Sequence, residues 1–367
     1  MRTPSAIGAR KNDHIAICAS SGALRASQVN GGPGFERVHL AHMALPELSV
    51  REIDPSIVFL GRSLKMPLLI SCMVGGTRAS ARINRDLARA AQEARVAIGL
   101  GSFRIALEDE RLERRFDLRD EAPDVPILAN LGATALSAYA PRRVSELARR
   151  IGSDALVVHL NTGQELFQRE GDRDFSGLRA AVGRLIRESG MPVIVKETGF
   201  GIGPALARSL VEEGTSYVDL AGSGGTNWIE VEARRLPAGP LRDAASRFDR
   251  WGYPTALLLE SMRESEVLRG RLIASGGISD GVEAAKAIAM GASLVGLAAP
   301  ILRASLSRGA EGALGYLEGL RCGLVAAMCM TGSRDVAELA RGIAWADPSF
   351  AQEAAALRAC DSRASAR

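Results

Sequence analysis

The chain has 367 residues, 47% of them hydrophobic, and its 46 basic and 42 acidic residues give a formal net charge of +4. This length and hydrophobic content suffice for one large core or two modest ones, and a small net charge without a dominant basic run argues against nucleic acid as the main partner. Aromatic residues make up only 4% of the chain, too few for the stacking platform of a single-strand nucleic-acid binder.

The cysteines and the apolar runs indicate the cellular compartment. Five cysteines are scattered along the chain without a Cys-x-x-Cys pair, so neither a disulfide framework nor a zinc site is predicted. Residues 1–10 lack the apolar core of a signal peptide, and we expect no membrane-spanning segment because no uninterrupted apolar run is long enough. We therefore expect a reduced, cytoplasmic protein.

We expect residues 1–66 to form an extension ahead of the main domain. It includes a glycine-rich loop at residues 30–34 and a polar run at residues 10–14 that contains Arg10, Lys11 and His14. Two interpretations of this run remain open. It forms either a solvated basic end or an anion clamp folded over a site, since Arg and Lys side chains suit phosphate oxygens.

Eight short apolar runs typical of buried parallel strands follow, at residues 67–71, 95–99, 126–130, 155–160, 192–196, 217–221, 271–275 and 293–297. Amphipathic helices are predicted among them over residues 83–94, 178–188, 203–213 and 281–290. Eight strand–helix units in about 230 residues favour a single α/β domain, a (β/α)8 TIM barrel over residues 67–345. An open dinucleotide-binding sheet would place Gly-x-Gly-x-x-Gly near its first strand, and that motif is absent there.

Two segments fall outside the regular alternation. About 50 residues separate the sixth and seventh strands, which is long for one connection, and its charged part at residues 227–250 is predicted to form a lid or an assembly surface. After Pro300 further helices, including residues 311–330, are expected to close the barrel or bury a subunit contact. The alanine-, arginine- and serine-rich tail at residues 346–367 is expected to be frayed.

A row of polar side chains ends the fourth predicted strand. His159, Asn161, Gln164 and Glu165 come within seven residues, directly after an apolar run. Each alone is compatible with an ordinary polar loop, but further polar residues lie at or just past the other strand ends: Ser71, Ser102, Asn130, Lys196 and Ser275. In a (β/α)8 barrel these ends meet at one face, which carries the chemistry.

Glycines gather at the same strand ends, at residues 75–76, 222–225 and 276–277. Glycine lets the backbone approach a ligand closely and offer its N–H groups to phosphate oxygens. The pair after the seventh strand, followed by a helix that starts near Asp280, is typical of the phosphate site that barrels build after strands seven and eight.

Ten short motifs carry a family resemblance that runs from about Arg10 to Leu339; they occupy residues 10–14, 44–47, 70–76, 129–132, 159–165, 170–175, 195–201, 222–228, 251–255 and 274–278. In these residues and in their order the chain resembles the type 2 isopentenyl diphosphate isomerases, flavin enzymes built on a (β/α)8 barrel. The resemblance implies interconversion of isopentenyl and dimethylallyl diphosphate by reduced FMN, with Mg²⁺ on the diphosphate and NADPH as the reductant. It also implies a homo-oligomer, a tetramer or octamer.

The resemblance assigns roles to individual residues. The flavin ring and ribityl chain would be lined by Cys72, Met73, Val74, Ser102, Asn130, Lys196, Ala221 and Thr226, and the FMN phosphate by Gly277, Ile278, Ser279, Ala298 and Ala299. The substrate would be held by Arg10, Lys11, His14, Arg104, Asn161 and Gln164, and Glu165 would bind magnesium. His159, Lys196 and Gln164 would be catalytic. Because an amide is a poor base, the flavin or a water must share the proton transfer with Gln164.

Three residues depart from the family pattern. Val74 replaces a threonine and could retune the flavin, Phe103 replaces a glutamine and could reshape the substrate wall, and Ser279 replaces an arginine near the FMN phosphate. A repurposed prenyl-diphosphate enzyme therefore stays open. So does a flavin oxidoreductase such as a 2-hydroxy acid oxidase, although the His-x-Gly-x-Arg-type site expected after its seventh strand is absent. A third alternative is a flavin- or phosphate-binding module without catalysis.

Overall fold

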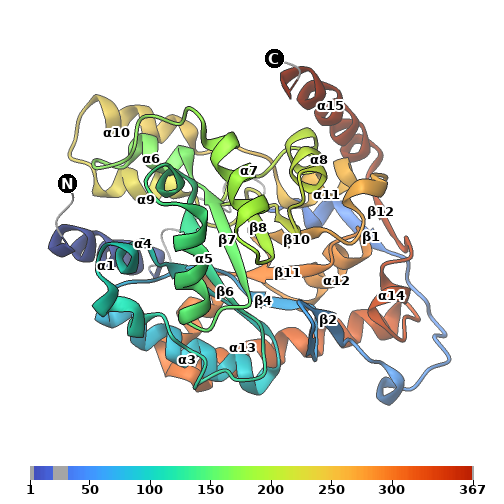
Figure 1. The fold of residues 1–367 in the computed structure, drawn as a ribbon. Coiled ribbons are helices and arrows are strands. Elements are labelled where there is room, and N and C mark those ends of the chain that lie inside the picture. The colour runs from blue at the N-terminus through green and yellow to red at the C-terminus, as the bar shows by residue number, and fades with distance from the viewer. Residues whose placement is uncertain (1–3, 20–31, 366–367) are drawn as a thin grey trace.

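The computed structural model describes residues 4–19 and 32–365. The ends of the chain, and residues 30 and 31 of the predicted glycine-rich loop, lie outside these ranges. Eight parallel strands close into a barrel in chain order (Figure 1). They are β4 (Leu68–Ile70), β5 (Ala97–Ser102), β6 (Ile127–Gly132), β7 (Ala155–Leu160), β8 (Val193–Glu197), β9 (Tyr217–Asp219), β10 (Leu272–Ser275) and β11 (Leu294–Leu297). Each overlaps one predicted strand, which confirms the (β/α)8 barrel.

The register of the barrel strands brings the predicted site residues side by side. Asn130 pairs with Ser102 on β5, His159 on β7 pairs with Lys196 on β8, and Lys196 pairs in turn with Asp219 on β9. Below this level the strand residues are buried and mostly aliphatic, apart from the half-buried Tyr217 at the start of β9, as expected where a parallel sheet is covered on both faces. The strands thus deliver their polar residues to one rim above an apolar core.

An outer layer of helices covers the barrel: α3 (Arg78–Ala94), α5 (Pro141–Arg150), α7 (Leu178–Glu188), α8 (Pro204–Glu212), α11 (Thr255–Met262), α12 (Gly281–Ala289) and α13 (Ala299–Met330). The four predicted helices are confirmed, although α3 begins five residues earlier than expected. Thr77 and Ser80 form a reciprocal capping box there, so the helix starts at its cap rather than at its first apolar residue.

Helix α13 is the longest element and runs beside α3 along the outside of the barrel (Figure 1). By length and composition alone it is apolar enough to cross a membrane, although no such segment was expected. Its apolar face packs on α3 and α12, and the backbone leaves helical geometry at Arg308 and at Gly309, whose φ is +60°. These contacts make α13 a wall of the barrel.

The N-terminal extension adds elements that the sequence did not reveal. Helix α1 (Pro4–Ala19) lies against α9 and α13, strand β1 (Val38–Leu40) pairs antiparallel with β12 (Ala344–Ala346), and a hairpin of β2 (Ile57–Phe59) and β3 (Arg62–Leu64) precedes the first barrel strand. Helix α14 (Val336–Leu339) lies just before β12. Short 3-10 turns are η1 (Phe35–Arg37), η2 (Val50–Glu52), η3 (Glu110–Arg115), η4 (Ala133–Ser137), η5 (Ser246–Phe248) and η6 (Glu266–Leu268).

The prediction of a frayed tail at residues 346–367 is wrong. Residues 348–365 form helix α15 (Pro348–Ser365), which packs on α8 and α11 at the edge of the molecule (Figure 1). Phe350 and Leu357 are buried in that contact, and Asp361 accepts a hydrogen bond from the backbone N–H of Ala205 at 2.6 Å. Composition pointed to disorder because so few large apolar residues carry this contact.

Four short helices lie over the C-terminal ends of the strands: α4 (Arg104–Glu108), α6 (Thr162–Phe167), α9 (Trp228–Arg235) and α10 (Pro240–Ala245). The segment predicted as a lid, residues 227–250, contains α9, α10 and η5. It packs on α6 through a small apolar cluster that includes Phe167, Phe200 and Ile229. The segment is therefore part of the wall around the mouth of the barrel.

Candidate active site

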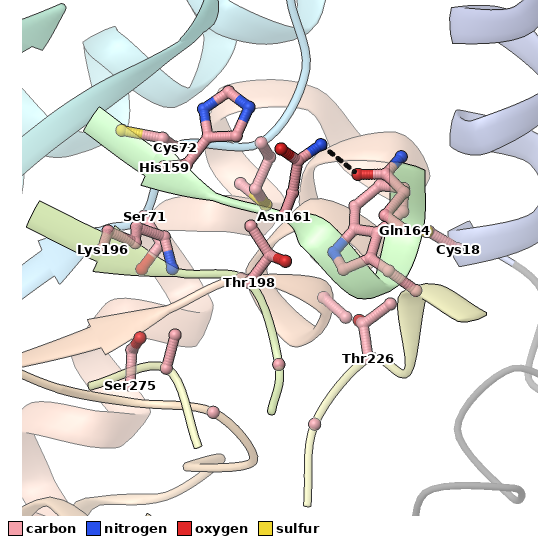
Figure 2. Close-up of a pocket in the computed structure, with 18 of the residues that line it drawn as sticks. Cys18, Ser71, Cys72, His159, Asn161, Gln164, Lys196, Thr198, Thr226 and Ser275 are labelled. Atoms are coloured by element: carbon pink, nitrogen blue, oxygen red, sulfur yellow. Dashed lines mark hydrogen bonds between the residues drawn. The ribbon is translucent and has the colours of Figure 1, made fainter. Parts of the chain in front are cut away.

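A cavity of about 410 Å³ opens at the C-terminal end of the barrel strands, where this fold carries its chemistry (Figure 2). Every site residue predicted from the sequence lines it, from Arg10 and Lys11 on α1 to Ala298 and Ala299 after β11. Residues nearly 300 positions apart thus meet in one place. The structure separates none of the predicted site residues from the others.

The floor of the cavity near β9 and β10 is backbone. A Cβ added to Gly225 would lie 2.7 Å from the nitrogen of Gly277, and Gly277 itself has a φ of +86°. Thr255 fixes this loop, because its hydroxyl lies 3.0 Å from the carbonyl oxygen of Ser275 and 2.6 Å from that of Gly276. The glycines are needed here for close approach, which leaves peptide groups facing the cavity.

His159 is held neutral beside two cations. Burial, followed by the nearby charges of Lys196 and Lys11, lowers its pKa to about 4. Its Nδ1 lies 2.9 Å from the Asn130 side-chain oxygen, which can only accept, so Nδ1 carries the proton and Nε2 is the acceptor. Gly132 makes room for this ring, since a Cβ there would come within 3.0 Å of Nε2. His159 therefore offers a neutral imidazole to the cavity.

Lys196 carries a buried positive charge next to His159. Its ammonium group donates to the carbonyl oxygen of Glu197 at 2.9 Å and lies 3.5 Å from Asp219 Oδ2. Asp219 is in turn fixed by Ser275, whose hydroxyl donates to Oδ1 at 2.5 Å. An ion pair from two adjacent strands thus places the ammonium group at the bottom of the cavity.

Gln164 is fixed at both ends of its side-chain amide. Its oxygen accepts a hydrogen bond from Asn161 Nδ2 at 3.2 Å, as drawn in Figure 2, and its nitrogen donates to Glu232 Oε1 at 3.1 Å. The same carboxylate lies 2.8 Å from His14 Nε2 and 2.6 Å from Arg235 Nη1. Burial raises the pKa of Glu232, but the hydrogen bonds from His14, Gln164 and Arg235 outweigh it and leave that pKa below its ordinary value. Glu232 is therefore a carboxylate behind Gln164.

Glu165 is buried and lies on α6, the short helix that also carries Gln164. Asn161 Nδ2 donates to one carboxylate oxygen at 3.1 Å, and the backbone N–H of Asp172 donates to the other at 2.8 Å. Among the described residues no cluster of three or more His, Cys, Asp or Glu side chains could hold a metal ion. A site with this single carboxylate suits Mg²⁺ that takes its remaining ligands from water and substrate phosphates.

Three cations line the cavity near α1 and α4. Burial, followed by the charge of Arg10, lowers the pKa of Lys11 to about 8. Within residues 4–19 and 32–365, the ion pairs of Arg104 are loose, with Glu108 at 3.4 Å and Asp172 at 3.8 Å. Arg10 lines the cavity beside Lys11. This arrangement favours the interpretation of residues 10–14 as an anion clamp.

The cavity also contains polar atoms without a protein partner. Within the described chain, Ser71 Oγ and Thr198 Oγ1 are buried and make no hydrogen bond. Buried polar atoms are normally paired, so these hydroxyls indicate a polar ligand that completes their hydrogen bonds. Hydroxyls, glycine loops and a buried ammonium group are a donor set that fits FMN, whose ring and ribityl chain carry matching polar atoms.

The three residues that depart from the family pattern lie in different places relative to the cavity. Phe103 does not reshape the substrate wall, because its side chain is fully buried in the apolar core and lies outside the cavity lining. Val74 does line the cavity. Ser279 lies at its edge, where both its backbone N–H and its hydroxyl donate to Glu283, at 2.7 and 3.1 Å.

The lining residues and supports that escaped the sequence analysis include Thr198, Trp228, Glu232 and Arg303. Glu232 was hidden in the charged segment that was predicted to form a lid, and Arg303 in a helix that was assigned to closing the barrel. Helical spacing offered a signal only for Trp228 and Glu232, which stand four positions apart on α9 and therefore share a face. That face touches α1, where the Trp228 ring lies edge-on to His14.

Comparison with protein families and curated proteins identifies the group to which the site belongs. The family model described as FMN-dependent dehydrogenase matches residues 129–346, more than half of the chain. A protein from Synechococcus sp. named isopentenyl-diphosphate delta-isomerase is 46% identical over 302 residues, covering 82% of this chain and 86% of its own. Proteins of the same name from Pseudescherichia vulneris and Pyrococcus abyssi are 44% and 40% identical, covering 90% of this chain and 94% and 90% of theirs.

Solved structures with the same fold are more distant in sequence. A mutant flavocytochrome b2 with benzoylformate has a TM-score of 0.64 at 20% identity, covering 89% of this chain and 80% of its own. Mandelate oxidase with benzoyl-formic acid has a TM-score of 0.56 at 19% identity, covering 86% and 88%. These likenesses support the barrel alone, whereas the curated relatives define the family. The chain belongs to the type 2, FMN-dependent isopentenyl-diphosphate delta-isomerase family.

Proposed function

We propose that the protein interconverts isopentenyl and dimethylallyl diphosphate without net electron transfer, with FMN in the cavity, NADPH as its reductant and Mg²⁺ on the diphosphate. The names of the curated relatives support the reaction, and the family supports the flavin. The observation that carries the proposal is the Gln164 amide, which lines the cavity and is fixed between Asn161 and the Glu232 carboxylate. This is an arrangement for moving a proton.

The residues around the flavin would set its charge. When bound and reduced, FMN supplies an acid–base group strong enough for an unactivated alkene, which side chains alone protonate poorly. Lys196 would stabilise the anionic form, because its ammonium group is buried and its position is fixed by Asp219. His159, being neutral, adds no second positive charge beside it and can accept a hydrogen bond at Nε2.

The diphosphate would bind at the α1 side of the cavity. Arg10, Lys11 and Arg104 supply positive charge there, and Arg side chains suit bidentate contacts with phosphate oxygens. Glu165 would hold Mg²⁺ against the same oxygens. The hydrogen bonds from Asn161 and Asp172 fix the direction of its carboxylate before any ion binds.

Proton removal from the substrate would pass through Gln164 to Glu232. Isomerisation requires that one carbon gain a proton and another lose one, so the site needs a proton acceptor as well as a donor. Gln164 is a poor base, but its N–H already points at an ionised carboxylate 3.1 Å away. Glu232 thereby supplies the partner that the amide needs.

The main alternative is a flavin oxidoreductase. It is considered because the matching family model is described as FMN-dependent dehydrogenase and because mandelate oxidase has the same fold. The residues after β10 argue against it. Gly276, Gly277 and Ile278 follow that strand, so no imidazole base stands there, and the cavity histidines His14 and His159 come from α1 and β7.

The deciding measurement is the amount of reductant consumed per product formed. Anaerobic protein with reduced FMN and Mg²⁺ should convert isopentenyl diphosphate to its isomer with reductant use far below one equivalent. In heavy water the product should gain deuterium from solvent. One reductant consumed per product, or oxygen-dependent turnover without isomer, would assign the protein to the oxidoreductases.

We also propose a homo-oligomer. Trp251 is 60% exposed and Tyr253 39% exposed, in the connection after η5. Exposed aromatic side chains of this size are typical of protein interfaces. Light scattering after gel filtration gives the subunit number directly, and a monomer at all concentrations contradicts the proposal.

A further inference from the structure

A buried carboxyl group that the proposed reaction does not use stands at the end of β8. Glu197 directly follows Lys196 on that strand, and its side chain is not among those that line the cavity. Burial raises the pKa of Glu197 more than the hydrogen bonds from the following residues lower it. Burying an acid is unfavourable unless its oxygens are hydrogen-bonded, so the contacts of this side chain identify its role.

Those contacts are with the loop that follows the strand. Oε2 of Glu197 accepts hydrogen bonds from the backbone N–H groups of Gly199, Phe200 and Gly201, at 2.6, 2.5 and 3.1 Å. Three consecutive N–H groups thus converge on one oxygen, and the loop turns around it. Without this carboxyl group the three donors would lose their acceptor, although Gly199 and Phe200 are buried.

The loop held by Glu197 packs tightly against the neighbouring wall of the cavity. Gly199 has a φ of +146°, and a Cβ added there would lie 2.5 Å from the carbonyl oxygen of Thr226. The carbonyl oxygen of Phe200 accepts a hydrogen bond from the Tyr253 N–H at 2.9 Å. Gly199 and the preceding Thr198 line the cavity. The carboxyl group therefore fixes one segment of the cavity wall against the next.

Phe200 connects this loop to the helix that carries Gln164. Its ring belongs to the apolar cluster between α6 and α9, together with Phe167 and Ile229. Gly163 comes directly before Gln164, and a Cβ added at Gly163 would lie 2.9 Å from Cε2 of Phe200. The ring therefore supports α6 one residue from the Gln164 amide, at a point where glycine allows the close approach.

We propose that Glu197 is a positioning residue for the isomerisation: through its loop and the Phe200 ring it fixes α6, and with α6 the Gln164 amide, relative to the substrate. The inference rests on the proposed function. Because Glu197 does not line the cavity, it acts through Phe200 and not on a ligand. A displacement of about 1 Å at a reacting group can cost on the order of a hundredfold in rate, so loss of this support should appear in kcat.

The test measures kcat with reduced protein at saturating FMN, Mg²⁺ and isopentenyl diphosphate. Glu197→Ala should lower kcat by roughly 10- to 100-fold. Glu197→Gln should stay within about threefold of the wild type, because an amide oxygen still accepts the N–H groups of the loop. Phe200→Leu should also lower kcat. The double variant should be no slower than Glu197→Ala alone, because both changes break the same connection.

Flavin binding gives a readout that does not depend on turnover. Flavin-free Glu197→Ala, titrated with FMN and followed by flavin fluorescence, should show a Kd raised by no more than about tenfold. That is the most that one neutral hydrogen bond, from the Thr198 hydroxyl, accounts for. A larger loss of FMN binding assigns the loop to the cofactor and overturns the inference.

Asp154 is the matched control, because it holds backbone at the opposite end of the barrel. It stands directly before β7, accepts the Ile127 N–H at 2.8 Å and pairs with Arg119 at 2.7 Å. Asp154→Asn should lower the urea midpoint and leave kcat unchanged, which separates loss of stability from loss of positioning.

The outcomes separate the inference from the proposed function. Wild-type kcat in Glu197→Ala, or a Glu197→Gln as slow as Glu197→Ala, contradicts the positioning role and leaves the isomerase standing. So does a double variant in which the two losses multiply. If Glu197→Ala does not fold, Phe200→Leu decides: a loss of roughly tenfold or more supports the role, and wild-type kcat excludes it. Wild-type protein that forms no isomer overturns both.

Discussion

At the scale of single residues, Lys11 differs from the two arginines beside it because it can lose its proton near neutral pH. Burial lowers its pKa to about 8, whereas Arg10 and Arg104 stay charged. Lys11 is cationic below that pH and neutral above it. If it holds a diphosphate, kcat/KM for isopentenyl diphosphate should fall as the pH rises through about 8. That ratio reports the free enzyme, so a bound substrate does not shift the value.

Two lysine variants check this assignment. Lys11→Arg should keep the clamp charged and move the alkaline limb of the kcat/KM profile to well above pH 9. Lys65 is exposed and is not part of the cavity lining, so Lys65→Arg should leave the profile as it is. A wild-type profile that stays flat to pH 10 excludes Lys11 as a charged contact of the substrate.

Glu232 carries the second prediction. Glu232→Gln keeps the shape of the side chain but removes the carboxylate that receives the Gln164 N–H. Turnover should drop by roughly 10²- to 10⁴-fold, the usual contribution of a general acid–base group, while FMN still binds. Glu230 lies on the same helix and pairs with Arg234 at 2.9 Å on the surface, so Glu230→Gln serves as the control. A Glu232→Gln enzyme that retains more than a tenth of wild-type kcat contradicts the proton path.

The contrast between Gln164 and Glu232 shows what the sequence could provide at this scale. Gln164 belongs to a polar row that directly follows an apolar strand, so its place at the rim was predictable. Glu232 lies 68 positions later in a charged helix, where a catalytic carboxylate and a surface one have the same pattern. Only the packing of α9 against α6 and α1 distinguishes Glu232 from its neighbour Glu230. Phe103 is the converse case. The sequence suggested that it lies in the substrate wall, whereas its side chain packs in the apolar core outside the cavity lining.

At the scale of elements, α15 stabilises the fold through one polar contact with α8 as well as through its apolar face. Pro204 occupies the first turn of α8 and Gly203 before it has no side chain, so α8 has no cap of its own. Asp361 takes that role from another helix by accepting the Ala205 N–H. Asp361→Ala should therefore destabilise the protein by about 1 kcal/mol, the typical cost of a lost helix cap.

Urea unfolding measures that loss as a lower midpoint with an unchanged slope. Ser362 is the matched position on α15, because its hydroxyl donates only to the carbonyl oxygen of Arg358 in its own helix. Ser362→Ala should be close to neutral. If Asp361→Ala unfolds at the wild-type midpoint, the contact between α15 and α8 is apolar alone.

Element prediction succeeded where local patterns decide the structure and failed where distant partners do. The eight barrel strands are short but strongly aliphatic, so each was found within a few residues. Strands β1 and β12 have three residues each and exist because Val38 pairs with Ala346, more than 300 positions away. No local periodicity encodes such a pair. Helix α15 likewise depends on the surfaces of α8 and α11 rather than on its own composition.

At the scale of the whole molecule, the site is assembled from the entire length of the chain. The cavity lining includes residues from α1 and from the loops after β4, β5, β7, β8, β9, β10 and β11. A ligand that contacts these loops together binds only the folded barrel, since the unfolded chain keeps none of them adjacent. Such a ligand stabilises the native state by an amount that grows with its free concentration.

FMN should therefore raise the unfolding temperature of flavin-free protein. At a free concentration one hundred times its Kd, the gain is about 2.7 kcal/mol, which corresponds to a rise of a few degrees for a domain of this size. Riboflavin should give a smaller rise at the same concentration, and adenosine monophosphate, which carries a phosphate without the isoalloxazine ring, should give none. Differential scanning calorimetry measures all three. Equal rises with FMN and adenosine monophosphate would mean that the cavity binds phosphate without selecting the flavin. No rise with either flavin would mean that the buried hydroxyls of Ser71 and Thr198 serve another ligand, because a cofactor that contacts both sides of the barrel must be linked to its folding.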